Sequence, residues 1–166
     1  MTIHSEHPFQ TPPEQRDRAR QLRGRLPSAV TIITAGQDGM TASAVFVVEG
    51  DPPRVIIGIS ETADFHDAVN ETGRFVMQIA DHQHRHLSDR FAEIAPSPGG
   101  LFAGLEVIET PYGPRLGGLD NWAGCRLERT IQVGSQILVV GQIEELDLGE
   151  LEDPLIYFRG RYRRLA

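Results

Sequence analysis

Three small polar side chains lie between two contrasting patterns near the middle of the sequence. Ser60, Thr62 and Asp64 follow an apolar, β-branched run over residues 54–59 and precede a helical period that starts at Phe65. A turn between a buried strand and a helix N-terminus presents free backbone N–H groups, which suit an anionic or carbonyl-rich ligand. The same residues also fit an ordinary strand-to-helix turn capped by Asp64, and the local pattern alone favours that simpler interpretation.

A second candidate lies just upstream, where small residues fall in a predicted strand. The run over residues 40–48 begins Met-Thr-Ala-Ser-Ala, and Asp51-Pro52-Pro53 separates it from the strand over residues 54–59. Prolines have no amide donor, so this corner cannot belong to a central ladder. Small side chains let strand backbone approach a flat heterocycle, and they equally allow tight packing between strands.

The elements that would position these residues are mostly strands. Turn chemistry at Gln37-Asp38-Gly39 predicts a hairpin between residues 29–34 and 40–48. Helical patterns cover residues 65–72, ending at Gly73, and residues 82–94, with Leu87 and Ile94 on one side. Further strands are predicted over residues 75–80, 122–130, 136–142 and 155–162. Strands without long helical crossovers indicate a mainly β fold, an antiparallel Greek-key sheet that closes on itself with helices at its edges.

Composition limits the possible functions. The chain has 166 residues, 40% of them hydrophobic, which fits one globular domain. Its net charge of −7 argues against a nucleic-acid or anionic-membrane partner. No apolar run approaches membrane-spanning length. The single cysteine, Cys125, excludes an internal disulfide and fits a reducing, cytoplasmic location.

The N-terminal region differs from the rest. Residues 1–25 are expected to form an arm followed by a short helix that starts at Pro13 and ends near Gly24, and residues 26–166 form the domain. The helix is rich in arginine, and a solvated helical face is the simplest interpretation of these charges, with a phosphate-facing role for one arginine as the less favoured alternative.

Several segments, taken in order, resemble the flavin reductase-like family. Each segment alone is a weak signal, but their succession covers the chain from about Leu26 to the C-terminus. The segments are Gly39–Ala44, Asp51–Val55, Thr62–Ala68, Thr72–Val76, Leu87–Ala92, Phe102–Gly104, Trp122–Cys125 and Pro154–Tyr162.

The resemblance implies an FMN-binding split β-barrel and a homodimer with flavin at the dimer interface. It also implies that the small-residue strand runs along the flavin ring and that the turn after the next strand holds the phosphate. The expected cofactor-binding residues are Met40, Thr41, Ala42, Ser43, Ala44, Ser60, Thr62, Ala63, Asp64, Phe65, His66 and Arg90. The nicotinamide side is expected to include Gln136, Tyr157 and Arg159.

Two positions depart from the family pattern. The phosphate turn carries Glu61 and Asp64, where relatives commonly have a basic residue and hydroxyl groups, and a carboxylate cannot donate to phosphate. Arg85 or Arg90, or an arginine of the partner subunit, is a candidate for neutralising the turn. We therefore expect weak flavin binding, with riboflavin less disfavoured relative to FMN than in relatives. Gln136 stands where many relatives have histidine, and it cannot shuttle protons.

Other chemistry-bearing side chains favour structural roles. His82 and His86 lie one helical turn apart, but the sequence signals no third metal ligand, so no metal is predicted. Cys125 lies on an apolar strand near Trp122, which favours a buried structural thiol over a nucleophile. We assign no catalytic residue.

These observations lead to a functional prediction with alternatives. The resemblance implies an oxidoreductase in which NADH or NADPH reduces FMN or FAD, and the reduced flavin serves a partner monooxygenase or another acceptor. The first alternative is a non-enzymatic module on the same fold that binds flavin, haem or another planar ligand. The second is a dimeric structural or regulatory protein with a vestigial pocket.

Overall fold

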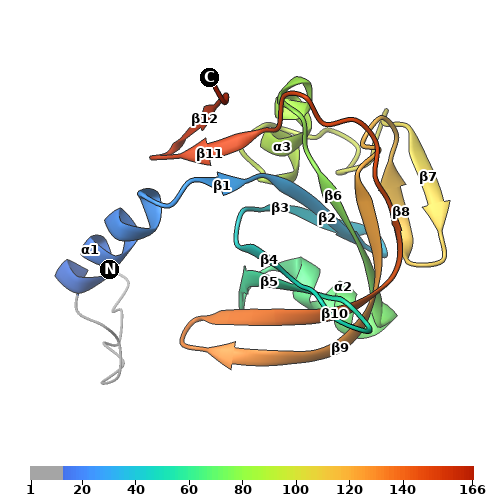
Figure 1. The fold of residues 1–166 in the computed structure, drawn as a ribbon, viewed down its shortest axis with the longest axis horizontal. Coiled ribbons are helices and arrows are strands. Elements are labelled where there is room, and N and C mark those ends of the chain that lie inside the picture. The colour runs from blue at the N-terminus through green and yellow to red at the C-terminus, as the bar shows by residue number, and fades with distance from the viewer. Residues whose placement is uncertain (1–12) are drawn as a thin grey trace.

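The computed structural model describes residues 13–166, and the predicted arm over residues 1–12 lies outside the described part. Figure 1 shows a β-barrel with helices at its margins. The helical elements are α1 (Pro13–Gly24), α2 (Asp64–Thr72), the short 3-10 helix η1 (His82–His84) and α3 (Arg85–Phe91). The strands are β1 (Ser28–Ala29), β2 (Thr31–Ala35), β3 (Asp38–Ala42), β4 (Val45–Val48), β5 (Arg54–Ser60), β6 (Arg74–Ile79), β7 (Val107–Thr110), β8 (Gly113–Leu116), β9 (Trp122–Val133), β10 (Gln136–Asp147), β11 (Ile156–Phe158) and β12 (Arg161–Arg163).

Seven strands form the main sheet in the order β3-β2-β6-β9-β10-β5-β4, with antiparallel pairing throughout. The two edge strands, β3 and β4, are consecutive in the chain, so the link through Ser43 and Ala44 closes the sheet on itself. The N–H of Gly58 on β5 donates to the carbonyl of Ala44 at 2.8 Å and completes this corner. The predicted antiparallel split barrel is confirmed.

The predicted strand over residues 40–48 is wrong as a single strand, because its two halves pair with different neighbours. β3 pairs with β2 from Asp38 to Ala42, as the predicted hairpin requires, whereas β4 pairs with β5. The chain bends at Ser43, where it passes from one edge of the sheet to the other. The alternation of small and apolar residues continues through this bend, and for that reason the sequence reads as one strand.

The C-terminal strand predicted over residues 155–162 is also wrong as a single strand. β11 and β12 form a hairpin, with Phe158 opposite Arg161, and β11 pairs on its other side with β1. Figure 1 shows this small sheet at the margin of the barrel, next to the end of α1. A separate core cluster of Val30, Ala80 and Leu155 fixes the sheet to the barrel.

The helices follow the sequence pattern with two corrections. α2 ends at Gly73, which has the predicted left-handed conformation with φ 67°. Its N-cap is Ala63 rather than the predicted Asp64, which is the first helical residue. The helix predicted over residues 82–94 ends at Phe91, and Ile94 is 75% exposed instead of lying on the buried side.

The core of the barrel depends on one close backbone approach. A Cβ at Gly141 on β10 would lie 2.5 Å from the ring of Phe75, which is fully buried on β6. The ring of Phe65 from α2 meets Phe75 edge-on at 6.2 Å between centroids. Phe65, a predicted site residue, is therefore a core side chain that fixes α2 against the barrel.

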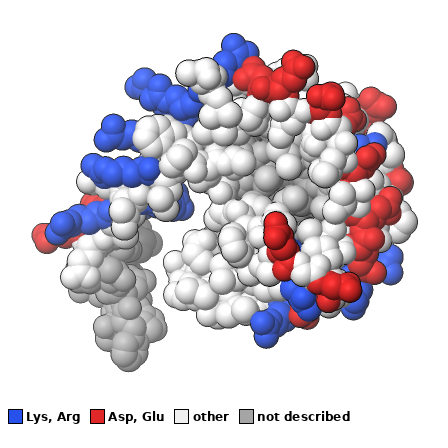
Figure 2. Space-filling view, viewed as in Figure 1, with Lys and Arg blue, Asp and Glu red and all other residues white. Residues whose placement is uncertain are grey.

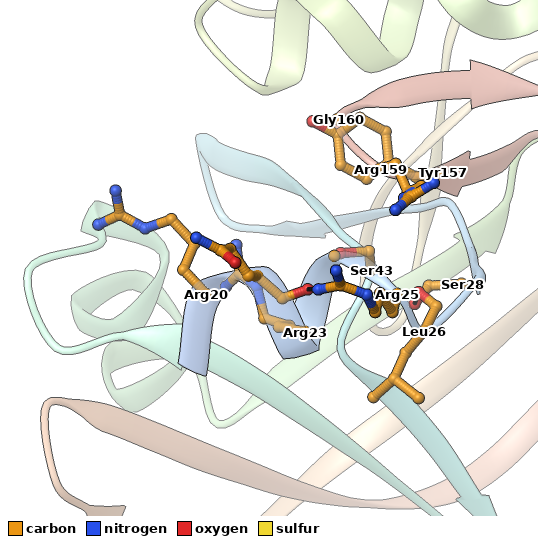
Figure 3. Close-up of a pocket in the computed structure, with 11 residues that line it drawn as sticks. Arg20, Arg23, Arg25, Leu26, Ser28, Ser43, Tyr157, Arg159 and Gly160 are labelled. Atoms are coloured by element: carbon orange, nitrogen blue, oxygen red, sulfur yellow. Dashed lines mark hydrogen bonds between the residues drawn. The ribbon is translucent and has the colours of Figure 1, made fainter. Parts of the chain in front are cut away.

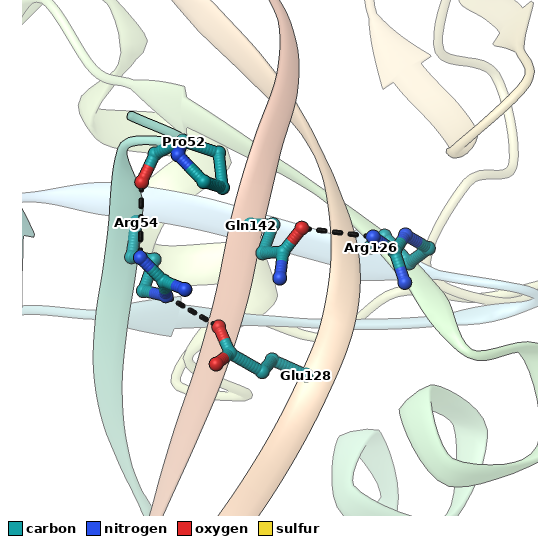
Figure 4. A network of polar contacts seen from close by, with 5 residues as sticks. All are labelled: Pro52, Arg54, Arg126, Glu128 and Gln142. Carbon is teal, nitrogen blue, oxygen red and sulfur yellow. Dashed lines mark hydrogen bonds and ion pairs between the residues drawn. The ribbon is translucent and has the colours of Figure 1, made fainter. Parts of the chain in front are cut away.

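The outer face of the sheet carries a polar network that links β5, β9 and β10 (Figure 4). Arg54 donates to Glu128 and to the carbonyl of Pro52, while Arg126 donates to Gln142 and Glu144. The bond from Arg54 is the largest cause that lowers the pKa of Glu128. The network fixes the Asp51-Pro52-Pro53 corner to the sheet. Within residues 13–166, no helix is long and apolar enough to cross a membrane.

Candidate functional site

The strand edge along β3 is the first component of the candidate site. β3 pairs with β2 on one side and is the outermost strand of the main sheet on the other. An outermost strand presents a row of N–H and C=O groups that its own sheet does not pair. Ser43 and Ala44, which continue this edge, are exposed. The backbone geometry therefore fits a flat ligand that needs hydrogen-bonding partners along one side.

The side chains of β3 itself contact the rest of the barrel and leave little for a ligand at the strand edge. Met40 packs on the main core, and Ala42 is buried. Thr41 donates from Oγ1 to the carbonyl of Ser88 on α3 at 2.6 Å, and Thr31 donates to the carbonyl of Ala42 at 2.8 Å. Among the predicted ring-lining residues, only Ser43 and Ala44 thus present exposed side chains to a ligand.

The hydroxyl-rich turn after β5 has its own internal bonds. The hydroxyl oxygens of Ser60 and Thr62 lie 3.0 Å apart, and the N–H of Ala63 donates to the carbonyl of Ser60 at 3.1 Å. Ala63 has no side-chain acceptor, so the first N–H groups of α2 lack the cap that Asp64 was expected to supply. The helix N-terminus is consequently less obstructed than the sequence suggested.

A cavity of about 260 Å³ lies beside this turn and is hereafter the acidic cavity. Of the predicted site residues it brings together Met40, Thr41, Ala63, Asp64 and Phe65. Its charged lining residues are Asp38, Asp64 and Glu93, and no arginine is among the described residues that line it. Three carboxylates disfavour a phosphate here.

The arginine predicted at the cofactor site is engaged elsewhere. Arg90 donates from Nη2 to the carbonyls of Gly100 and Ala103, at 2.9 and 2.7 Å, and so fixes the loop that follows α3. The guanidinium of Arg85, which we also considered for the acidic turn, lies over the ring of Tyr162 at 5.1 Å. Within the described chain, neither arginine lines the acidic cavity.

A second and larger cavity, of about 570 Å³, lies between α1 and the β11–β12 hairpin (Figure 3). We call it the basic cavity. It is lined by Ser43, which is predicted to lie along the flavin ring, and by Tyr157 and Arg159, which are predicted to lie on the nicotinamide side. Its wall on the α1 side includes Arg20, Arg23 and Arg25, which the sequence interpretation left as solvated charges. The arginine-rich composition of α1 draws attention to these residues, but it does not indicate which part of the protein the helix faces.

Gln136, Ser60 and His66 are not among the described residues that line the acidic or the basic cavity. Gln136 begins β10 and pairs directly with Ser60 on β5, so it adjoins the hydroxyl-rich turn. Tyr157 and Arg159 line the basic cavity instead, so the three predicted nicotinamide-side residues fall into two separate groups. His66 is half-buried in the first turns of α2.

The histidines after β6 form a local cap. Asp81 accepts from the N–H of Gln83 at 3.1 Å, and Nδ1 of His84 accepts from the N–H of Asp81 at 3.1 Å. Burial, the largest cause, lowers the pKa of His84 and favours the neutral ring that this bond requires. Among residues 13–166, no group of three or more His, Cys, Asp or Glu side chains could hold a metal ion.

Cys125 is buried on β9, as the sequence predicted. Burial raises the pKa of its thiol to about 12. A thiol with so high a pKa is protonated at neutral pH and is therefore a poor nucleophile. Trp122 is buried on the same strand, with Arg115 over its ring.

Comparisons with known proteins bear on the family and the fold of this chain. The family described as the flavin reductase like domain matches residues 23–166, and the chain belongs to that family. It is 30% identical over 156 residues to the reductase component of 4-hydroxyphenylacetate 3-monooxygenase from Thermus thermophilus, with 89% of this chain and 95% of that protein covered.

Another relative is named FMN reductase (NADH) RutF, from Ancylobacter novellus. It is 30% identical over 159 residues, covering 93% of this chain and 88% of that protein. Among solved structures, the flavin reductase PheA2 in its native state matches with a TM-score of 0.83 and 25% identity, over 90% of this chain and 97% of that one. The predicted family is therefore confirmed.

Proposed function

We propose that this protein is an NAD(P)H-dependent flavin reductase. The observation that carries the proposal is the open edge of β3 with its exposed continuation at Ser43 and Ala44, next to a cavity lined by Tyr157. Family membership over residues 23–166 supports it. FMN or FAD would supply the redox chemistry, accepting a hydride from NADH or NADPH.

The chain's own residues would act by orientation. Backbone N–H and C=O groups along the β3 edge would hold the polar side of the flavin ring, and Ser43 would lie beneath it. Tyr157 packs edge-on against Tyr162 at 5.7 Å between centroids, which gives the opposite wall of the basic cavity a fixed aromatic surface. Hydride transfer between stacked rings depends on alignment more than on a protein acid or base, so we still assign no catalytic residue.

A partner oxygenase would use the reduced flavin that this protein releases. The Thermus relative is named as the reductase component of such a system. The acidic turn at Asp64 agrees with weak flavin binding, and a weakly bound flavin can leave after reduction and reach a second protein. The proposal predicts that free flavin, rather than a permanently bound one, sustains turnover.

We further propose a homodimer in the cytoplasm. The outermost strand β4 exposes Phe46 and Val47, at 64% and 51%, and the tip of the β9–β10 hairpin exposes Val133. Exposed apolar residues on an unpaired strand edge favour association with a second copy. The free thiol of Cys125 fits a reducing compartment. Light scattering would measure the dimer, and we expect Phe46→Ser to shift it toward monomer.

Anaerobic oxidation of NADH and NADPH, measured with FMN, FAD or riboflavin added separately, tests the function. Ser43→Phe should abolish turnover by filling the space beside the strand edge. Glu71→Phe places the same side chain on the exposed face of α2 and should leave turnover unchanged. Flavin binding without oxidation would favour the non-enzymatic module, and no binding of any flavin would contradict both.

A further inference from the structure

The basic cavity concentrates positive charge on a protein that is acidic overall. The net charge is −7, yet Arg20, Arg23, Arg25 and Arg159 all line one cavity. No Asp or Glu is among the described residues that line it. Figure 2 shows several basic side chains over α1 and near the C-terminal hairpin, while most of the acidic side chains lie on the opposite side of the view. A cavity of one charge sign concentrates ligands of the other sign.

Arg159 is held in place by a turn that ordinarily favours other residues. It joins β11 to β12 together with Gly160, and both have positive φ, 52° and 75°. A two-residue hairpin turn of this kind prefers Asn, Asp or Gly at its first position. The N–H of Arg159 donates to the carbonyl of Gly24 at 3.0 Å, which ties the turn to the end of α1. An arginine kept in a strained position beside a cavity indicates a use for its side chain.

Among the described residues, local contacts engage few of the N–H donors of Arg25 and Arg159. Arg25 donates from Nη1 to the carbonyl of Gln21 at 3.1 Å, and Arg159 lies 5.9 Å from the ring of Phe158. A guanidinium has five N–H donors, so each retains several. The ion pairs between described residues use Arg54, Arg126 and Arg164. Figure 3 shows Arg159 extending from the hairpin into the space above Ser43 and Arg25.

We propose that the basic cavity binds the 2′-phosphate on the adenosine ribose of NADPH, so that the protein prefers NADPH to NADH. This inference rests on the proposed function. A ribose 2′-hydroxyl is commonly held by a carboxylate, whereas a 2′-phosphate is commonly held by arginine, and the described lining offers only the second. The volume of about 570 Å³ suits a nucleotide, and Ser43 connects the cavity to the strand edge where the flavin would lie.

Direct binding tests the site without turnover. Adenosine 2′,5′-bisphosphate and adenosine 3′,5′-bisphosphate are isomers of equal charge that differ only in where the second phosphate is attached. Calorimetric titration should show the 2′,5′-bisphosphate binding about tenfold or more tightly, as expected for added charge-assisted hydrogen bonds. Equal affinities, or binding of neither compound, would overturn the assignment to the 2′-phosphate.

Variants locate the site. Arg25→Gln and Arg159→Gln should each lower kcat/KM for NADPH about tenfold or more while changing that for NADH less than threefold. The matched controls are Arg18→Gln on α1 and Arg161→Gln on the hairpin, which are exposed and lie outside the described lining of the cavity. Should Arg159→Gln fail to fold, Arg159→Asn replaces it, because asparagine suits the turn.

The outcomes separate three explanations. Loss of the NADPH preference in the cavity variants alone supports the proposal. If the cavity variants instead alter the FAD-to-FMN ratio and leave the NADPH-to-NADH ratio unchanged, the arginines hold a flavin phosphate and the proposal is wrong. If neither nucleotide is oxidised with any flavin, the proposed function fails, and the titration with adenosine 2′,5′-bisphosphate still decides whether the phosphate site exists.

Discussion

The acidic and basic cavities lie at opposite ends of the same strand edge and have opposite electrostatics. Asp38, Asp64 and Glu93 line the first, and four arginines line the second. The acidic cavity includes Met40 and Thr41 of β3, and the basic cavity includes Ser43, which directly follows β3. A ligand lying along the edge therefore meets a repulsive end and an attractive end for phosphate.

Under the proposed function, one scaffold would separate ring binding from phosphate binding. The strand edge depends on the barrel, whose strands are fixed by the core around Phe75. The two cavities depend on surface side chains at α2 and at α1, which can change without altering the barrel. Under that proposal, the fold would determine where a flat ring lies, and the charges at each end would determine which phosphorylated molecule is retained.

The largest effect is expected from reversing the charge of the basic cavity. The double variant Arg25→Glu/Arg159→Glu should lower kcat/KM for NADPH about hundredfold or more, because it removes two charge-assisted contacts and adds repulsion. Steady-state kinetics at low ionic strength measures the change. The double variant Arg18→Glu/Arg161→Glu gives the same net charge outside the cavity. An equal fall in both would attribute the effect to overall charge.

Removing negative charge from the acidic cavity should strengthen phosphate binding there. Asp64→Ser removes a carboxylate from the start of α2 and supplies a donor, so FMN affinity relative to riboflavin should rise about tenfold. Flavin fluorescence quenching gives both affinities. Asp67→Ser makes the same change in the first turn of α2 but outside the described lining of the cavity, and should have a smaller effect. If wild-type protein already binds FMN far more tightly than riboflavin, a compensating cation must be present.

Tyr162 connects the β11–β12 hairpin to α3, and removing its hydroxyl should have an intermediate effect on stability. Its hydroxyl donates to Asp89 at 2.7 Å and lies 2.8 Å from Ser88 Oγ, so it ties β12 to α3. Tyr162→Phe should lower the free energy of unfolding by about 1 kcal/mol, measured by urea denaturation at pH 7.

The same residue gives a pH dependence. Burial, the largest cause, raises the pKa of Tyr162 above its ordinary value of 10.0. The folded state therefore favours the neutral phenol, and its contribution to stability is complete below pH 10 and is lost as the pH rises through the folded pKa. Wild-type protein should lose more stability than Tyr162→Phe between pH 9 and 11. Parallel loss in both proteins would contradict this role.

The smallest expected effect is at Cys125, which lies in the barrel and away from both cavities. Because burial raises the pKa of its thiol to about 12, native protein at pH 8 should react negligibly with iodoacetamide, as measured by mass spectrometry. The cavity variants should behave in the same way. Rapid labelling of any variant would show that its barrel had opened and that its kinetic change has a structural cause.

The barrel was largely predictable from the sequence, because strand patterns and turn residues are local signals. The Gln37–Gly39 turn predicted the β2–β3 hairpin, and Gly73 predicted the end of α2. The bend at Ser43 was not predicted, since the change of partner from β2 to β5 leaves no mark on the local pattern. The hairpin turn at Arg159 was missed because arginine is unusual at positive φ.

The candidate site was predicted only in part, for a related reason. The ordered segments identified the strand edge and the hydroxyl-rich turn. They could not show that Arg90 binds the loop carbonyls of Gly100 and Ala103, or that arginines of α1 line the same cavity as Arg159. Such pairings depend on three-dimensional packing between distant segments, which composition and periodicity do not encode.

The bond from the N–H of Arg159 to the carbonyl of Gly24 joins segments from opposite ends of the described chain. While the protein is being synthesised, the barrel strands through β10 emerge from the ribosome before this bond can form. A nascent or prematurely terminated chain that lacks the final hairpin would have the strand edge but would lack one wall of the basic cavity. The basic cavity would therefore be complete only after the β11–β12 hairpin has emerged and has packed against the end of α1.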